Sequence, residues 1–464
     1  MKSLKMILKL RGFGPLLALE LLCSCAMRHA LIAQAGTSQS QSHSVPDIEI
    51  TPNPAFIDQP VKILLRDFPV GKLVAVQLLT TNVQGQPLRS YAEFFTDRDG
   101  DADLAAEAPA SGTYRHADAA GLFWSLRTAN TNMAALIQKD LGPVRYNLVA
   151  SVNGHTVATA TIERYFLSPG VRRIQVREHG LRGTLFLPAG KGPWPGVIVL
   201  GGSEGGLGLW TEAEAACLAA KGYAAFALAY FDYEDLPKSL ENIPLEYFQT
   251  AIYWLQARDD IRSNSIAVLG GSRGGELALL LGATFPEIHA VVGISASSVL
   301  WGGLGTNAAA MPHPAWTYQG KALPFMEHRN YDQFDGMLEQ NPFDTVQRFQ
   351  AALAKYPAVA KASIPVEKIN GPVLLISGNN DKMSPSTQLE DMAMIRLKEA
   401  RHAFPDRHFA YSGAGHIIFL PNMPTTSNFV IRWGGDPEAT AAAAADSWSR
   451  IVEFLDQSLI PNRH

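Results

Sequence analysis

Cysteine is scarce in this chain, which holds only Cys23, Cys25 and Cys217 among its 464 residues. Removal of an N-terminal leader would leave Cys217 alone, so no disulfide framework is available to stabilise the fold. No Cys and His residues stand at the spacing of a zinc site, and we predict neither a metal nor a cofactor. Cys217 lies in an alanine-rich helical stretch, where we expect a small buried hydrophobe.

The chain also lacks an excess of positive charge and a long internal apolar run. Its formal net charge is −4, which argues against nucleic acid as a partner. Beyond the N-terminus there is no run of about 20 apolar residues, so no internal membrane span is predicted. With 47% hydrophobic and 18% charged residues, the composition is that of a globular protein, and the length indicates two or three domains.

Residues 1–35 have the pattern of a targeting segment. A basic region precedes the mostly apolar stretch 13–22, and Ala33-Gln34-Ala35 fits a signal-peptidase site with cleavage after Ala35. Residues 22–25, Leu-Cys-Ser-Cys, resemble a bacterial lipobox in which Cys25 carries a lipid anchor, although Glu20 inside the apolar stretch opposes insertion. We predict export to the bacterial periplasm or as a lipoprotein; the alternative is a retained leader on a cytoplasmic protein.

A β-rich domain is predicted at residues 47–167, after a flexible Ser/Gln-rich tether at 36–46. Residues 61–65 and 73–78 are rich in β-formers. Residues 146–152 and 155–162 flank Asn153-Gly154, the strongest short signal for a hairpin with a primed turn. Short strands separated by Gly, Pro and Asp predict an all-β sandwich of immunoglobulin-like type. It contains no catalytic constellation that we can identify.

Residues 172–460 alternate between apolar strands and helices, which is typical of a parallel sheet. The predicted strands are 195–200, 223–229, 265–269, 290–294, 373–377 and 408–411, and the predicted helices are 211–221, 245–257, 276–283 and 437–459. The stretch 301–361, with its Pro, Trp, Tyr, Phe and Met residues, breaks this rhythm. We predict that it is a cap inserted over the site, with an ordinary surface excursion as the alternative.

The strongest functional signal is Gly270-Gly271-Ser272-Arg273-Gly274, between an apolar strand and an Ala/Leu-rich helical stretch. This strand–turn–helix context is that of a nucleophile elbow, in which a tight turn lifts a serine hydroxyl clear of the sheet. Gly270 and Gly274 would let strand and helix approach closely. Ser272 is therefore the candidate nucleophile; the alternative is a tight turn without catalytic meaning.

A serine nucleophile needs a base, and the base needs an orienting acid. In α/β-hydrolases these follow the serine in the order acid, then histidine. Asp381 comes just after the strand 373–377, and His416 lies in the Gly-rich loop after the strand 408–411, so both are predicted at carboxyl ends of strands. The competing residues, which we expect to be structural or solvated, are His289, His313, His328, His402, His408, Asp391 and Asp436.

An oxyanion requires preorganised N–H donors. One predicted donor is the backbone N–H of Arg273, directly after the serine. The second is predicted in the Gly-rich loop 201–206, at Ser203 or Glu204. A Gly-rich loop before a helix also occurs in dinucleotide-binding folds, but this one lacks the G-x-G-x-x-G spacing and a well-placed ribose acid.

With these residues in place, the chain resembles the acyl-CoA thioesterase and bile acid-CoA:amino acid N-acyltransferase family over roughly residues 46–460. The resemblance is carried by the blocks 180–188, 228–238 and 431–435 and by the segments around Ser272, Asp381 and His416. It implies an accessory β-sandwich before an α/β-hydrolase domain. Family members that transfer acyl groups to amino acids carry cysteine at the elbow, whereas thioesterases carry serine, so Ser272 favours hydrolysis.

Two features depart from the family pattern: Glu204 stands where the family usually has glycine, and a leader points to export although acyl-CoA is a cytosolic metabolite. The block 233–237, which follows a predicted strand, has two possible roles: its side chains line the active site, or they fix the loop by local capping. Lys221, Lys238 and Arg273 are the candidate contacts for CoA phosphates, though they form no dense cluster.

We predict a serine hydrolase that cleaves acyl thioesters, with fatty acyl-CoA as the favoured substrate and small-molecule esters as the second choice. The alternatives are an exported carboxylic ester hydrolase, an acyltransferase that uses an acyl-CoA donor, and a non-catalytic envelope protein that binds ligands. Acyl chain length and oligomeric state are left open.

Overall fold

The computed structural model describes residues 45–464 except 84, 129–139, 306–312, 328–341 and 461–464. The predicted leader, with Cys25 and Ala35, and nearly all of the predicted tether lie outside the described residues, as does His328. None of the helices in the described part of the chain is long and apolar enough to span a membrane.

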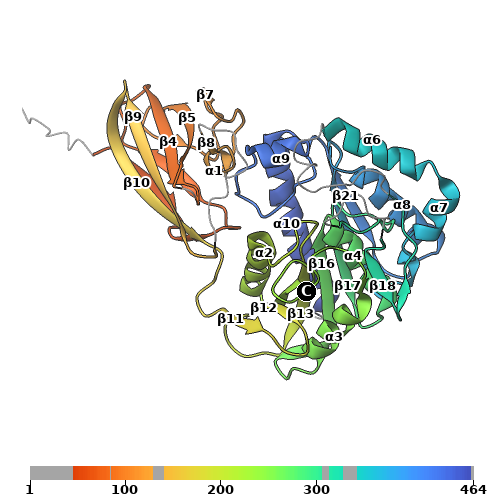
Figure 1. The fold of residues 1–464 in the computed structure, drawn as a ribbon. Helices are drawn as coiled ribbons and strands as arrows, with labels where there is room; N and C mark the ends of the chain where they lie inside the picture. Colours follow the sequence, from red (N-terminus) through yellow and green to blue (C-terminus); the bar gives the residue numbers. More distant parts are fainter. Residues whose placement is uncertain (1–44, 84, 129–139, 306–312, 328–341, 461–464) are drawn as a thin grey trace, which may run out of the picture. The chain divides into compact units, whose positions relative to one another are not determined.

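The N-terminal part consists of two sheets (Figure 1). The smaller sheet has the order β1-β3-β6, formed by Asp47–Thr51, Lys62–Arg66 and Ala102–Asp103. The larger has the order β2-β10-β9-β4-β5-β7, with β8 also on β5; these strands are Ala55–Phe56, His155–Tyr165, Val144–Val152, Leu73–Thr81, Pro87–Phe95, Ser111–Gly112 and Arg127–Thr128. A single helical turn, α1, spans Gly121–Trp124.

Alternating burial explains why the two sheets pack face to face. Along β4, Val74 and Val76 are buried whereas Gln77 is exposed, so one face of the strand is apolar. That face shares one hydrophobic cluster with Ile63 of the smaller sheet. The predicted hairpin is confirmed: β9 and β10 pair antiparallel, and Asn153 and Gly154 have φ values of 51° and 79°, as a primed turn requires.

An eight-stranded sheet forms the centre of the C-terminal part, with the order β11-β12-β14-β13-β16-β17-β20-β21. The strands are Arg172–Val176, Arg182–Leu187, Ala224–Ala229, Trp194–Leu200, Ile261–Gly271, Ala290–Ile294, Val373–Gly378 and Arg407–Tyr411. β11 and β12 are antiparallel to their neighbours, and the strands from β14 to β21 run parallel. The predicted parallel sheet is confirmed, and the carboxyl ends of its strands lie at one edge.

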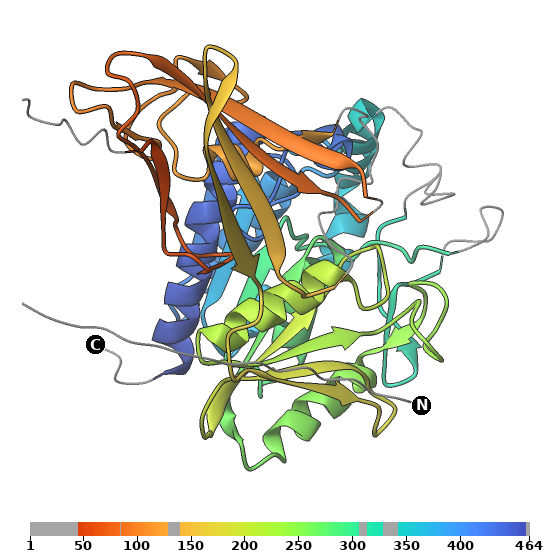
Figure 2. The same cartoon turned by 90° about the vertical axis from the view of Figure 1, so that its left-hand side faces the viewer.

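Helices cover both faces of this sheet, as expected for strands that are buried on both sides. Val197 and Val199 of β13 belong to the hydrophobic cluster with α2 and α10, whereas Ile198 and Leu200 belong to the cluster with α3, α4 and α8. The helices are α2 (Leu209–Ala220), α3 (Leu245–Gln256), α4 (Arg273–Thr284), α8 (Ser386–Glu399), α9 (Asn428–Arg432) and α10 (Pro437–Leu459). Figure 2 shows the long α10 running beside the strands it contacts. Cys217 of α2 is buried, as predicted.

The predicted cap at about 301–361 falls between β17 and β20. Its described residues form β18 (Trp316–Tyr318), β19 (Lys321–Ala322), α6 (Pro342–Leu353) and α7 (Tyr356–Ala362), and a 3₁₀ turn, Val366–Lys368, follows. β18 also pairs with the short β15, Ile243–Pro244. Trp301 lies edge-on to Phe349 of α6, with ring centroids 4.6 Å apart.

The buried Asp58 links the β-rich part to the helices of the C-terminal part. Its carboxylate accepts a hydrogen bond from the indole of Trp448 at 3.0 Å and pairs with Lys221 at 2.7 Å. Nearby, the amide of Asn422 donates to the carbonyl of Ile57 at 2.7 Å. Lys221 is therefore engaged in a structural ion pair.

Candidate active site

Ser272 sits at the turn between β16 and α4 with φ 54° and ψ −119°. Such a conformation costs roughly 1–3 kcal/mol and persists only where the surroundings enforce it. Here the backbone N–H of Ser272 donates to the carbonyl of Ile294 at 2.7 Å, and its carbonyl accepts from Gly275 and Glu276 at 3.0 and 3.1 Å. The end of β17 and the first turn of α4 therefore hold the turn, which has the shape of a nucleophile elbow.

The glycines around the serine differ in how strictly they are required. A Cβ on Gly270 would lie 2.2 Å from the carbonyl oxygen of Gly274, and one on Gly274 would lie 2.4 Å from the carbonyl oxygen of Gly201. On Gly271 a Cβ would meet nothing closer than 4.0 Å. The expectation that Gly270 and Gly274 permit a close backbone approach is thus confirmed.

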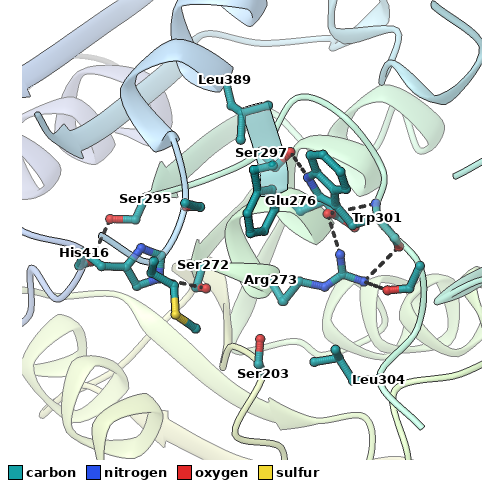
Figure 3. A pocket seen from close by; sticks show the side chains of 14 residues that line it. Ser203, Ser272, Arg273, Glu276, Ser295, Ser297, Trp301, Leu304, Leu389 and His416 are labelled. Atoms are coloured by element: carbon teal, nitrogen blue, oxygen red, sulfur yellow. Dashed lines mark hydrogen bonds and ion pairs between the residues drawn. The ribbon is translucent and has the colours of Figure 1, made fainter. Parts of the chain in front are cut away.

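His416 reaches the serine from the loop after β21. Its Nε2 is 3.0 Å from Ser272 Oγ, and its Nδ1 is 2.7 Å from Asp381 Oδ2. Figure 3 shows the imidazole pointing toward Ser272 at one end of the pocket. The backbone of His416 is fixed as well, because its carbonyl accepts a hydrogen bond from the hydroxyl of Ser295 at 2.7 Å. The three predicted residues are therefore joined in one chain of hydrogen bonds.

Asp381 follows β20 and has nearly all of its carboxylate out of contact with solvent, with 3% of the side chain exposed. Oδ1 accepts from the backbone N–H groups of Met383 and Ser384 at 2.7 and 3.0 Å. Oδ2 accepts from the hydroxyl of Ser386 at 2.6 Å and faces His416. This fixed carboxylate can orient the imidazole and stabilise its charged form.

The competing His and Asp residues have other roles in the described part of the chain. His402 faces Asp406 at 2.7 Å, and His408 contacts Asp391 at 3.0 Å. Asp436 caps the N-terminus of α10. The half-buried His289 has no hydrogen-bond partner at its buried Nδ1, and the carbonyl of His313 accepts from Gly303. None of these described residues contacts Ser272.

The predicted oxyanion donors lie at the start of α4, which holds Arg273, and in the loop 201–206, which holds Ser203 and Glu204. α4 begins at Arg273 and not at Glu276 as the sequence suggested, so the N–H of Arg273 is the first of a helix and has no intrahelical acceptor. Ser203 lines the pocket, and the side chain of Glu204 folds back so that its carboxylate accepts the N–H of Gly202 at 2.9 Å. The loop is also held by Tyr230, whose hydroxyl donates to the carbonyl of Gly201 at 2.7 Å. The assignment of Arg273, Ser203 and Glu204 as donors stays a prediction.

A pocket opens beside Ser272 and His416 (Figure 3). Its polar lining comes from the serines, the histidine and the pair Arg273–Glu276, and its apolar lining comes from larger side chains. The apolar residues are Trp301, Leu304, Phe349, Met383 and Leu389. A mainly apolar wall next to a serine and a histidine suits a substrate with an apolar acyl group.

Sequence reasoning missed Glu276, a carboxylate fully buried in α4 beneath this pocket. Burial raises the pKa of Glu276 to about 7, against the opposing effect of Arg273, whose Nη1 is 2.8 Å away. The available signal was an acid inside an otherwise Ala/Leu-rich helical stretch directly after the elbow.

The block 233–237 fixes a loop, the second of the two readings left open above. Glu234 pairs with Arg177 at 2.7 Å, and Asp235 pairs with Arg182 at 2.6 Å, both on the adjoining β11–β12 segment. The predicted phosphate contacts are likewise occupied: Lys238 donates to the carbonyl of Glu234 at 3.0 Å, Lys221 pairs with Asp58, and Arg273 pairs with Glu276.

The strand order is that of an α/β-hydrolase. The strained serine between β16 and α4, with His416 and Asp381 in one chain of hydrogen bonds, has the site geometry of a serine hydrolase. Residues 58–178 match the family model "Acyl-CoA thioester hydrolase/BAAT N-terminal region", and residues 243–461 match "BAAT / Acyl-CoA thioester hydrolase C terminal". The chain belongs to the acyl-CoA thioesterase and bile acid-CoA:amino acid N-acyltransferase family, and it is a thioesterase-like serine hydrolase of that family.

Two relatives illustrate the range of this family. Acyl-coenzyme A thioesterase 2, mitochondrial, of Mus musculus is 31% identical over 87% of this chain and 87% of its own length. Bile acid-CoA:amino acid N-acyltransferase of Homo sapiens is 32% identical over 89% of this chain and 97% of its own length. Hydrolases and transferases are thus similar to this chain to nearly the same degree.

Proposed function

We propose that the protein hydrolyses acyl thioesters, with fatty acyl-CoA as the substrate class, to a free fatty acid and the thiol. The observation that carries the proposal is the serine at the elbow, hydrogen-bonded to His416 within a family whose relatives act on acyl-CoA. The family resemblance associates serine at this position with hydrolysis and cysteine with transfer to an amino acid.

In the proposed mechanism His416 Nε2 accepts the hydroxyl proton of Ser272 as Oγ attacks the acyl carbonyl carbon. The backbone N–H of Arg273, with a second N–H from Ser203 or Glu204, stabilises the oxyanion of the tetrahedral intermediate. The carbon–sulfur bond breaks, the thiolate takes the proton from His416, and an acyl-serine remains. His416 then deprotonates water, which attacks the ester carbonyl. The bond from the acyl carbon to Ser272 Oγ breaks, His416 returns the proton to Oγ, and the acid leaves, while Asp381 keeps the imidazole oriented throughout.

Two reactions compete with this proposal on the same site. An oxyester in place of the thioester gives a carboxylic ester hydrolase, and an amine in place of water gives an N-acyltransferase. A non-catalytic binding protein is a third alternative, and it would leave Ser272 unreactive.

The deciding experiment presents one acyl chain in two forms, octanoyl-CoA and p-nitrophenyl octanoate, with and without glycine. We expect a higher kcat/KM for the CoA thioester, free octanoate as the product, and no N-octanoylglycine. Ser272→Ala should lower turnover by several orders of magnitude, and Ser449→Ala, on the exposed side of α10, serves as the matched control. Faster oxyester cleavage, or glycine conjugates as the main product, would contradict the proposal.

We further propose that the protein is exported. The support is the sequence of residues 1–35, with its basic region, apolar stretch and Ala-Gln-Ala site. Mass spectrometry of the mature N-terminus tests this: export predicts a chain that begins after Ala35 or at a lipid-modified Cys25. A chain that retains Met1 or Lys2 would favour the cytoplasmic alternative.

A further inference from the structure

Glu276 lies at the centre of a buried hydrogen-bond network that the chemical steps do not use. Its side chain is fully buried on the first turn of α4. Oε1 accepts from the indole N–H of Trp316 at 2.8 Å, and Oε2 accepts from the backbone N–H of Trp301 at 3.3 Å. Both tryptophans belong to the segment between β17 and β20, so Glu276 ties that segment to the helix that begins at the nucleophile.

Arg273 completes this connection from the other side. Its Nη1 pairs with Glu276 at 2.8 Å, and its Nη2 donates to the carbonyls of Trp301 and Gly302, each at 3.1 Å. The Arg273–Glu276 pair thus contacts both the N–H and the carbonyl of Trp301. Figure 3 shows the guanidinium between the serine and this stretch of chain.

The stretch held in this way is part of the pocket wall. Trp301, Gly302 and Leu304 line the pocket, and Phe349 packs against the Trp301 ring. The indole N–H of Trp301 donates to Ser297 Oγ at 2.9 Å, which fixes the ring as well as the backbone. An acyl chain that extends from Ser272 into the pocket would lie against this wall.

A buried ion pair is weak evidence for a role in stability, because well-packed apolar side chains often serve as well. This pair, however, joins the residue that follows the nucleophile to the pocket wall. We propose that Arg273 and Glu276 are positioning residues that hold the wall at Trp301 and Gly302 in register with Ser272, and so determine how tightly a long acyl chain binds. The proposal rests on acyl ester or thioester hydrolysis at Ser272, as proposed above.

The test compares a short and a long acyl chain on one leaving group, p-nitrophenyl acetate and p-nitrophenyl octanoate. Glu276→Gln keeps the shape and a carbonyl acceptor but removes the charge opposite Arg273. Arg273→Lys keeps a charge and the backbone N–H but loses the fork, in which Nη1 reaches Glu276 while Nη2 reaches the two carbonyls. For each variant we expect KM for the octanoate to rise at least tenfold, and kcat/KM for the octanoate to fall at least fivefold more than kcat/KM for the acetate, an order-of-magnitude estimate.

Two further measurements separate positioning from general damage. The rate at which a small fluorophosphonate labels Ser272 should fall less than kcat/KM for the octanoate does, since that probe does not fill the pocket. Glu367→Gln, which breaks the ion pair with Arg396 outside the pocket lining, is the matched control and should leave both esters unaffected.

Equal losses on acetate and octanoate, unchanged kinetics on both, or the same profile in Glu367→Gln would each overturn the proposal. If Glu276→Gln does not fold, Arg273→Lys decides by the same criteria. The ester series contains no coenzyme A, so a wild-type enzyme that cleaves the esters but not acyl-CoA would refute the proposed substrate and leave this inference standing.

Discussion

Replacing Asp381 by asparagine should place the proton of His416 on the wrong nitrogen. Oδ1 of Asp381 accepts from two backbone N–H groups, which cannot become acceptors, so the amide oxygen of asparagine must take that position. The amide NH₂ then replaces Oδ2 and faces His416 Nδ1, while the hydroxyl of Ser386 can rotate to accept from it. Nδ1 is thereby forced to accept, and Nε2 carries the hydrogen toward Ser272.

An imidazole in this tautomer cannot take the serine proton. The corresponding Asp→Asn change in a serine-protease triad lowers kcat by about 10⁴, which corresponds to roughly 5 kcal/mol of transition-state stabilisation. Because each backbone donor keeps its acceptor, the free energy of unfolding should change little. We expect a 10³- to 10⁴-fold lower kcat (an order-of-magnitude estimate) on p-nitrophenyl acetate, with an unchanged urea midpoint.

The matched control is Asp391→Asn, which alters a different carboxylate–imidazole contact, that with His408. Asp391 is largely exposed and pairs with His408, which is not one of the three residues of the proposed mechanism. The kcat of this variant should therefore stay within about twofold of wild type. If Asp381→Asn retains more than about a tenth of wild-type kcat in folded protein, the assignment of Asp381 as the orienting acid is wrong.

Three further predictions concern the glycines and the two glutamates near the site. Gly274→Ala should lower the free energy of unfolding in urea by about 3 kcal/mol or more, because the new methyl meets the Gly201 carbonyl, whereas Gly271→Ala should be tolerated. Burial raises the folded-state pKa of Glu276 to about 7, above the unfolded value of 4.5, so the folded protein favours the protonated carboxyl. This preference contributes roughly 3 kcal/mol to the free energy of unfolding below about pH 4.5, and the contribution is lost as the pH rises through about 7. Urea unfolding at pH 4 and pH 8 should show this difference in wild type and not in Glu276→Gln. Glu204→Gln should raise kcat about threefold at low salt, since it removes a negative charge near the oxyanion, and the gain should fade at high salt; a gain that does not depend on salt would exclude the electrostatic cause.

The elbow and the two partner residues were predictable because their signals are local. Tight turns need glycine at fixed offsets from Ser272, and Asp381 and His416 each follow an apolar strand in a polar or Gly-rich loop. Once the strands are parallel, their carboxyl ends meet at one edge, so three distant segments converge without any long-range signal in the sequence. The hairpin at Asn153-Gly154 was predictable for the same local reason.

The network around Glu276 was not predictable, because its partners are remote in sequence. Trp301 and Trp316 lie 25 and 40 residues further along the chain, in a segment with no periodic pattern. The block 233–237 was ambiguous for a similar reason: its acids pair with Arg177 and Arg182, more than 50 residues upstream. Charge alone marks such residues as important, but only the fold shows what they contact.

The most direct test of the account is to find which residue a fluorophosphonate modifies. Trypsin releases residues 263–273 as one peptide, which contains Ser272 and two other serines. We predict a single adduct on Ser272 by tandem mass spectrometry, lost in Ser272→Ala and formed at least 10³-fold more slowly in His416→Ala (an order-of-magnitude estimate). Folded wild-type protein that stays unlabelled, or that carries the adduct on another residue, would contradict the claim that Ser272 is the nucleophile.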